Sequence, residues 1–139
     1  MYKSGFAPSQ EEYDKNVVPL FGSLNKLEKI VSANGGPFIL GPEMTELDIT
    51  VYATLVRFDA VYVQHFKCNL GTIRHDYPVL NNWLKGVYWG VEAARDSTDF
   101  KHIKENVSLY ISLSGRGWVR LFPRILGLTR CSILRAITI

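Results

Sequence analysis

The sequence predicts an all-α protein, a helical bundle built around one buried central helix. Three observations predict it: two capping boxes, apolar residues spaced by three and four, and one long segment that is apolar on almost every side. The chain has 139 residues, of which 47% are hydrophobic and 21% charged. This composition supplies a core and excludes a chain that is disordered throughout.

The first predicted helix begins at a capping box and continues for about 23 residues. Ser9 and Glu12 have the S-x-x-E spacing, in which the hydroxyl and the carboxylate each accept a backbone N–H. Pro19 lies inside the segment and removes one backbone donor, so we expect a bend there. The run Asn34–Pro37 ends the helix. The apolar stripe consists of Tyr13, Val17, Leu20, Phe21, Leu24, Leu27, Ile30 and Val31.

The second predicted helix is the central one. Thr45 and Asp48 form a capping box with Asp in the place of Glu, which gives both residues a structural role. The segment from Ile49 to about Phe66 follows, and its length of roughly 18 residues favours a helix over a strand. Arg57 and Asp59 lie within this segment. Because buried charges need partners, we expect these two side chains to form a structural pair.

Two further helices complete the predicted bundle. Asp76-Tyr77-Pro78 opens one of them, with the proline in the first turn, where its missing N–H costs nothing. Its inner face consists of Val79, Leu80, Trp83, Leu84, Val87 and Tyr88. Thr98 is expected to cap a last short helix that extends through His102 and Ile103.

The charge is divided unevenly along the chain. Residues 1–100 carry 9 Lys+Arg and 12 Asp+Glu, whereas residues 101–139 carry 7 Lys+Arg and one acid, so the net charges are −3 and +6. Within 107–139, arginines alternate with apolar residues, a pattern typical of a basic surface helix at a membrane or of a single-strand nucleic-acid binder. Several glycines and Pro123 oppose a continuous helix. A divergent, poorly ordered tail, joined by a misread exon boundary, is the interpretation we favour.

The remaining signals point to a cytoplasmic protein without a membrane span. No apolar stretch approaches the ~20 residues of a spanning helix, and no secretory signal is visible at the N-terminus. Two cysteines, Cys68 and Cys131, are too few for a disulfide framework. The spacing of His65, Cys68 and His75 matches no standard zinc site, so no metal is expected. Cys68 itself is more simply a core residue than a nucleophile.

Residues 55–69, LVRFDAVYVQHFKCN, resemble the signature of the xi-class glutathione transferases, the S-glutathionyl-hydroquinone reductases. Three further segments are similar to that family: residues 2–7 to the start of its C-terminal helical domain, 45–49 to its Thr-Glu-Ala-Asp-Ile, and 98–104 to its last shared helix. The resemblance covers about residues 2–106. It implies a glutathione transferase C-terminal-like domain.

The resemblance also implies a reaction and a division of labour. In this family a thioredoxin-like N-terminal domain binds glutathione and supplies the catalytic Cys, while the helical domain forms the hydrophobic side of the active site and dimerises. The Cys thiolate attacks the sulfur of a glutathionyl-hydroquinone, and a second glutathione resolves the mixed disulfide.

The resemblance implies that Tyr2 corresponds to one of two tyrosines whose hydroxyls bind the substrate in this family. It also implies that Val107 occupies the position of the second tyrosine. We expect the thioredoxin-like domain to be absent, so the chain supplies no catalytic residue. A homodimer and a quinone-type substrate are expected partners, and no DNA is expected. The alternatives are a non-catalytic dimerisation module and a membrane or nucleic-acid binder that acts through its basic tail.

Overall fold

The computed structural model describes residues 1–105, which comprise a first compact unit, Met1–Asp99, and the helical start of a second unit at residues 100–105. The predictions for Val107 and for the tail 107–139 therefore lie outside the described residues. The first unit contains α1 (Tyr2–Gly5), α2 (Gln10–Asn34), α3 (Glu46–Leu55), η1 (Phe58–Tyr62), α4 (Val63–His65), α5 (Ile73–Asp76), α6 (Pro78–Gly90) and α7 (Glu92–Ser97).

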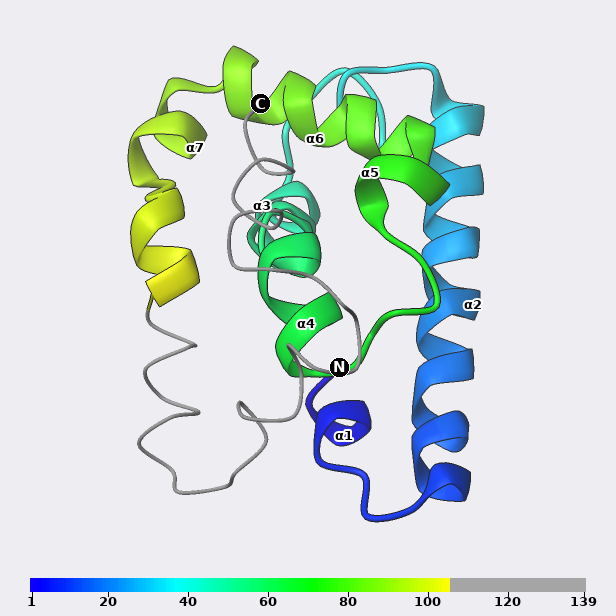
Figure 1. Ribbon diagram of the computed structural model, residues 1–139. Coiled ribbons are helices and arrows are strands. Elements are labelled where there is room, and N and C mark those ends of the chain that lie inside the picture. The colour runs from blue at the N-terminus through cyan, green and yellow to red at the C-terminus, as the bar shows by residue number, and fades with distance from the viewer. Residues whose placement is uncertain (106–139) are drawn as a thin grey trace. The chain divides into compact units, whose positions relative to one another are not determined.

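The all-α prediction is confirmed. Within residues 1–105 the extended structure is limited to one isolated bridge between Phe38 and Gly41. Figure 1 shows the arrangement of the first unit: α2 runs along one side, the α3–α4 segment lies beside it, and α6 crosses near one end of α2. No helix among the described residues is both long enough and apolar enough to cross a membrane.

Helix α2 follows the sequence signals closely. The Ser9 hydroxyl accepts the backbone N–H of Glu12 at 3.3 Å, as the capping box predicts. The Glu12 carboxylate pairs with Lys15 at 3.6 Å. The helix continues through Pro19 as one uninterrupted element (Figure 1). It ends at Gly35, whose left-handed φ of 59° favours glycine.

The central segment is not the single helix that the sequence predicts. After α3, the N–H of Arg57 bonds to the carbonyl of Thr54 instead of Ala53, and the Arg57 guanidinium takes the Ala53 carbonyl. The backbone then widens into a π-helix, η1, before the short α4. The segment is also less buried than predicted, since Ile49 is 56% exposed. Its inner face still supplies much of the core, with Tyr52, Leu55, Phe58, Val61, Tyr62 and Phe66.

Two carboxylates cap helices that are distant in the sequence. Glu28 of α2 accepts the N–H groups of Val79 and Leu80, both at 2.8 Å, at the N-terminus of α6. Asp59 of η1 accepts the N–H groups of Ile73 and Arg74 at 2.8 and 3.0 Å, at the N-terminus of α5. A negative charge at a helix N-terminus is favourable because the first N–H groups lack partners there. The Glu28 contacts join α2 to α6, and the Asp59 contacts join η1 to α5.

Candidate functional site

The candidate site is an aromatic cluster of Tyr2, Phe6, Tyr62 and Phe66, near the N-terminus of the chain. The Tyr2 ring meets Phe66 edge to face at a centroid distance of 4.7 Å and meets Tyr62 at 6.1 Å. Phe6 packs against Phe66 at 5.8 Å, and Tyr62 lies 5.5 Å from Phe66. These distances are those of favourable aromatic pairs. The cluster therefore joins α1 to the end of the central segment.

Gly5 permits the close approach of α1 to Phe66. A Cβ atom at position 5 would lie 2.7 Å from Cδ1 of Phe66 and 2.8 Å from its Cα. The second of these atoms is backbone, so a rotamer change could not relieve the clash. Gly5 is therefore required for the geometry of the aromatic cluster.

Half of the aromatic cluster faces solvent and half is buried. Tyr2 is 61% and Phe6 54% exposed, whereas Tyr62 and Phe66 are buried. Burial, with a smaller contribution from the neighbouring Tyr2, raises the pKa of Tyr62 above its ordinary value of 10.0. Tyr62 therefore keeps its proton at neutral pH. The cluster presents exposed ring surface and a phenolic hydroxyl, which suits an aromatic ligand that carries hydroxyl groups.

The backbone that follows the aromatic cluster is anchored by Tyr13 of α2. Its hydroxyl donates to the carbonyl of Lys67 at 2.7 Å and lies 3.0 Å from Oδ1 of Asn69. Lys67 has a left-handed φ of 56°, an unfavourable conformation for a lysine. The N–H of Cys68 also bonds back to the carbonyl of Tyr62 at 3.0 Å. These bonds hold the strained turn and, with it, the end of the central segment.

Cys68 is fully buried beneath this turn, with 0% exposure. Burial raises the pKa of its thiol above the ordinary 9.0, so the thiol stays protonated. It is therefore a core residue without the properties of a nucleophile. No group of three or more metal-ligating side chains occurs among the residues that the structure describes.

Thr45 and Asp48 form the reciprocal capping box at the start of α3. Asp48 is fully buried, and its carboxylate accepts the N–H of Ile39 at 2.8 Å as well as the N–H and hydroxyl of Thr45 at 2.9 and 2.7 Å. Burial alone would raise the pKa of Asp48, but these hydrogen bonds outweigh it and hold the pKa below the ordinary 3.8. Asp48 thus fixes both α3 and the loop before it.

The predicted pairing of Arg57 with Asp59 is wrong. Arg57 is exposed and bonds to the Ala53 carbonyl, whereas Asp59 caps α5 with its two backbone contacts. Burial raises the pKa of Asp59 above 3.8 in spite of the hydrogen bonds from Ile73 and Arg74. The prediction failed because it assumed that Arg57 was buried. An exposed guanidinium needs no ionic partner.

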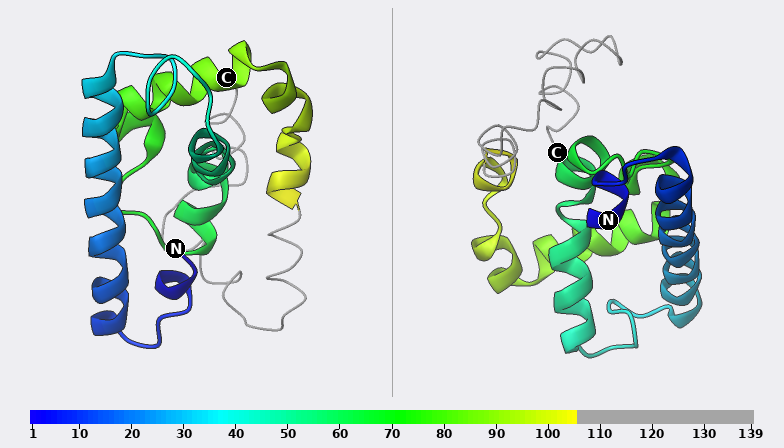
Figure 2. Two further views of the ribbon diagram at one scale, coloured as in Figure 1. Left: turned by 180° about the vertical axis from the view of Figure 1, so that it is seen from behind. Right: turned by 90° about the horizontal axis from the view of Figure 1, so that it is seen from below.

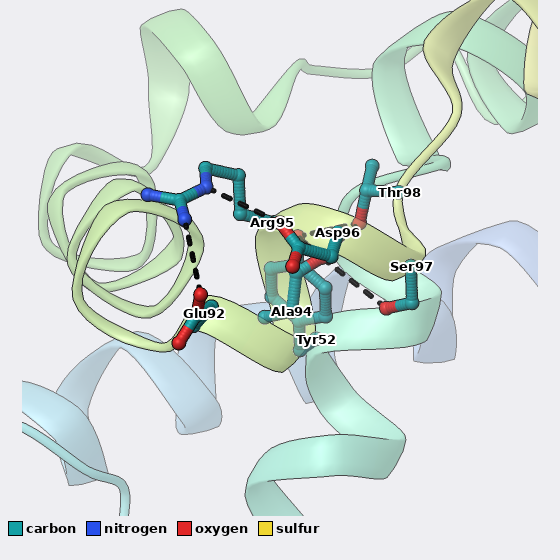
Figure 3. Close-up of polar contacts among 7 residues, drawn as sticks. All are labelled: Tyr52, Glu92, Ala94, Arg95, Asp96, Ser97 and Thr98. Atoms are coloured by element: carbon teal, nitrogen blue, oxygen red, sulfur yellow. Dashed lines mark hydrogen bonds and ion pairs between the residues drawn. The ribbon is translucent and has the colours of Figure 1, made fainter.

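Thr98 also differs from its prediction. Its hydroxyl donates to the Ala94 carbonyl at 2.7 Å and lies 2.8 Å from the Tyr52 hydroxyl (Figure 3). It therefore closes the C-terminal turn of α7 and ties α7 to α3, in place of capping the following helix. Desolvation raises the pKa of Tyr52 above 10.0, so that hydroxyl remains a donor.

The sequence reasoning missed the partners of Tyr2. Phe58, Tyr62 and Phe66 recur every four residues, a spacing that aligns aromatic side chains on one helical face and could have indicated the aromatic cluster. The link between this face and Tyr2 could not be read from spacing, because it depends on the approach of α1.

The comparisons with known proteins agree with this architecture. The family model described as glutathione S-transferase, C-terminal domain, matches residues 10–86. Glutathione S-transferase omega-like 2 of Schizosaccharomyces pombe is 56% identical over 104 residues, covering 75% of this chain and 33% of that protein. Glutathionyl-hydroquinone reductase YqjG of Escherichia coli is 42% identical over 106 residues, covering 76% and 31%.

Solved structures give the same result. The crystal structure of the xi glutathione-S-transferase from Phanerochaete chrysosporium is 49% identical with a TM-score of 0.71, covering 76% of this chain and 33% of that one. The glutathione-bound structure of YqjG matches at 42% identity and a TM-score of 0.69, again covering 76% and 33%. The chain spans about a third of the length of the curated relatives it matches. It belongs to the glutathione S-transferase C-terminal domain family, alongside xi-class and omega-like transferases and glutathionyl-hydroquinone reductases.

Proposed function

We propose that this chain is the hydrophobic-substrate side of a glutathione-dependent S-glutathionyl-hydroquinone reductase. The observation that carries the proposal is the identity of 42% over 106 residues, 76% of this chain, with the E. coli glutathionyl-hydroquinone reductase. Glutathione itself would bind to a thioredoxin-like domain, and the catalytic Cys would belong to that domain as well.

The aromatic cluster suits one part of this reaction. In the reaction a thiolate takes the glutathionyl sulfur from the hydroquinone, the C–S bond breaks, and the ring carbon gains a proton. A second glutathione then attacks the enzyme disulfide, which returns the thiolate and gives oxidised glutathione. The substrate ring is aromatic and hydroxylated, so the exposed ring of Phe6 would contact it and the Tyr2 hydroxyl would donate to a substrate oxygen.

A chimera tests the proposal. Residues 2–105 would replace the matching segment of the E. coli reductase, and the Tyr2→Phe form would be compared with Tyr13→Phe, which removes a hydroxyl from a structural contact. We expect Tyr2→Phe to reduce kcat/KM for a glutathionyl-hydroquinone about tenfold, because the variant loses one hydrogen bond to the substrate. The thermal stability of the chimera should not change. An active chimera in which Tyr2→Phe leaves kcat/KM intact would refute the role of Tyr2.

One sequence observation favours a second candidate function. By the resemblance, Val107 takes the position of the family's second tyrosine, and valine cannot donate a hydrogen bond. A chain that has one of the two expected pocket tyrosines suits a non-catalytic dimerisation module of the same family. Such a module would pair in the cytoplasm with a second copy of itself or with a full-length relative. Sedimentation of the full chain as a dimer, together with an inactive chimera, would favour this candidate over the reductase.

A further inference from the structure

The π-helix η1 sets the direction in which the rings of the aromatic cluster point. An α-helix turns by about 100° per residue, so residues separated by seven and then four positions share one face. Leu55, Tyr62 and Phe66 have this separation, and a continuous α-helix would put all three on the same side. A single π-turn inserts about one extra residue, which rotates every later residue by about 100°. The π-turn at η1 therefore separates the face of Leu55 from that of the two aromatic residues.

The contacts of these residues agree with such a rotation. Leu55 lines an apolar pocket together with leucines of α2. The rings of Tyr62 and Phe66 instead meet Tyr2 of α1, at centroid distances of 6.1 and 4.7 Å. Figures 1 and 2 show α1 beside the α4 end of the central segment. The change of helix type at η1 thus directs the two buried rings toward Tyr2.

Arg57 occupies the junction between α3 and η1. Its backbone N–H bonds to the carbonyl of Thr54 at 3.3 Å, so the carbonyl of Ala53 loses the N–H partner that an α-helix would give it. The guanidinium of Arg57 donates to the Ala53 carbonyl instead. Beyond the junction, the N–H of Val63 bonds to the carbonyl of Phe58, which is the five-residue bond of a π-helix. Arg57 therefore supplies a donor at the point where the backbone pattern changes.

The bond from Arg57 serves the backbone and not the charge of the side chain. The guanidinium is exposed, so water could solvate it without this contact. The same side chain lies near the aromatic cluster: burial raises the pKa of the Tyr62 hydroxyl, and the positive charge of Arg57 opposes that rise. Single π-turns inside helices occur often at functional sites. An exposed side chain that completes such a turn beside a substrate-binding surface suits a functional role.

We propose that Arg57 is a positioning residue for the hydroquinone reaction, because its bond to the Ala53 carbonyl holds η1 in the π-helical form. The π-helical form in turn keeps the rings of Tyr62 and Phe66 against Tyr2. Arg57 acts through these rings and does not touch the substrate, and the inference rests on the proposed function for the role of Tyr2. Without the guanidinium, the Ala53 carbonyl regains a partner only if the α-helix continues, which rotates both rings away from Tyr2.

Proton NMR of the full 139-residue chain tests the first step without any activity. The readout is the nuclear Overhauser effect between the ring protons of Tyr2 and Phe66. Arg57→Met removes the donor and should weaken this signal at least threefold, and Arg57→Leu should do the same. Arg57→Lys returns a donor and should keep the signal, as should the control Lys26→Met, which removes a charge from an exposed position of α2. Circular dichroism establishes that each variant is folded.

The chimera with the E. coli reductase tests the second step. Arg57→Met should lower kcat/KM for a glutathionyl-hydroquinone about tenfold, and Arg57→Lys should restore most of it. The same Arg57→Met change should lower kcat/KM less than about twofold in a chimera that already carries Tyr2→Phe, because Arg57 acts through Tyr2. A merely structural role would lower kcat/KM equally in both backgrounds.

The possible results separate this inference from the proposed function. An intact signal between the rings of Tyr2 and Phe66 in folded Arg57→Met would overturn the inference. An active chimera in which Arg57→Met leaves kcat/KM unchanged, or lowers it equally with and without the Tyr2 hydroxyl, would overturn it as well. A chimera without turnover would contradict the proposed function, and the NMR signal would still decide whether Arg57 holds the π-helix.

Discussion

Asp48→Asn is the sharpest perturbation of the fold, because one buried carboxylate organises two segments. Its oxygens accept three hydrogen bonds, from the N–H of Ile39 and from the N–H and hydroxyl of Thr45. Asparagine keeps the size of the side chain but replaces one oxygen by an NH₂ group. That group would face a backbone donor whichever way the amide turns, so at least one N–H loses its acceptor.

The cost follows from these contacts. Hydrogen bonds to a charged group contribute about 1.5–3 kcal/mol each, and a buried N–H without a partner costs about 1–3 kcal/mol. Since the effects are not additive, we expect Asp48→Asn to lower the free energy of unfolding by roughly 3 kcal/mol at pH 7. Typical domains are stable by only ~5–15 kcal/mol, so the loss is a large part of the total.

The pH dependence has a definite sign. The pKa of Asp48 is lowered below 3.8 in the folded state, so its contribution is present above that value and is lost as the pH falls through the folded pKa. Urea denaturation at pH 7 and near pH 3 measures the difference in the free energy of unfolding between the wild type and Asp48→Asn. This difference in the free energy of unfolding should be smaller near pH 3 than at pH 7. A difference below about 1 kcal/mol at pH 7, or a larger difference near pH 3, would refute the reasoning.

Three further predictions concern single contacts. Glu28→Gln removes the charge that caps α6 and should lower the free energy of unfolding, measured by urea denaturation, by about 1 kcal/mol. The control Glu43→Gln, at an exposed position, should change it by less than about 0.5 kcal/mol, and equal effects of the two variants would contradict the capping role of Glu28. Gly5→Ala should lower the Tm because the added Cβ meets Phe66, whereas Gly22→Ala, which has open space around it, should raise the Tm. A higher Tm for both variants would contradict the close approach of α1 to Phe66. Tyr52→Phe should cost about 1 kcal/mol and speed hydrogen exchange in α7 but not in α2, and unchanged exchange in α7 would show that its hydroxyl bonds are dispensable.

Much of the fold was predictable because it depends on local signals. The N-cap at Ser9, the glycine stop at Gly35 and the capping box at Thr45 are set by residues within a few positions of each other, and the structure has all three. The apolar stripe of α2 also forms the expected buried face, although Ile30 is 47% exposed.

The rest depends on contacts that no local pattern contains. The central segment has helical length and composition, but the side chain of Arg57 competes for the Ala53 carbonyl and the backbone changes to a π-helix. Glu28 and Asp59 cap helices 14 or more residues away, and their sequence neighbours give no sign of it. The aromatic cluster likewise requires α1 to reach Phe66 across the fold. Tertiary packing decided each of these cases.

The central claim is that this chain forms the substrate side of a glutathionyl-hydroquinone reductase. The most direct measurement is the glutathione-dependent turnover of a glutathionyl-hydroquinone by the wild-type chimera with the E. coli reductase, beside the full chain alone. The account predicts turnover by the chimera within about tenfold of the parent enzyme and none by the chain alone. A folded, glutathione-binding chimera without turnover, or turnover by the chain alone, would contradict it.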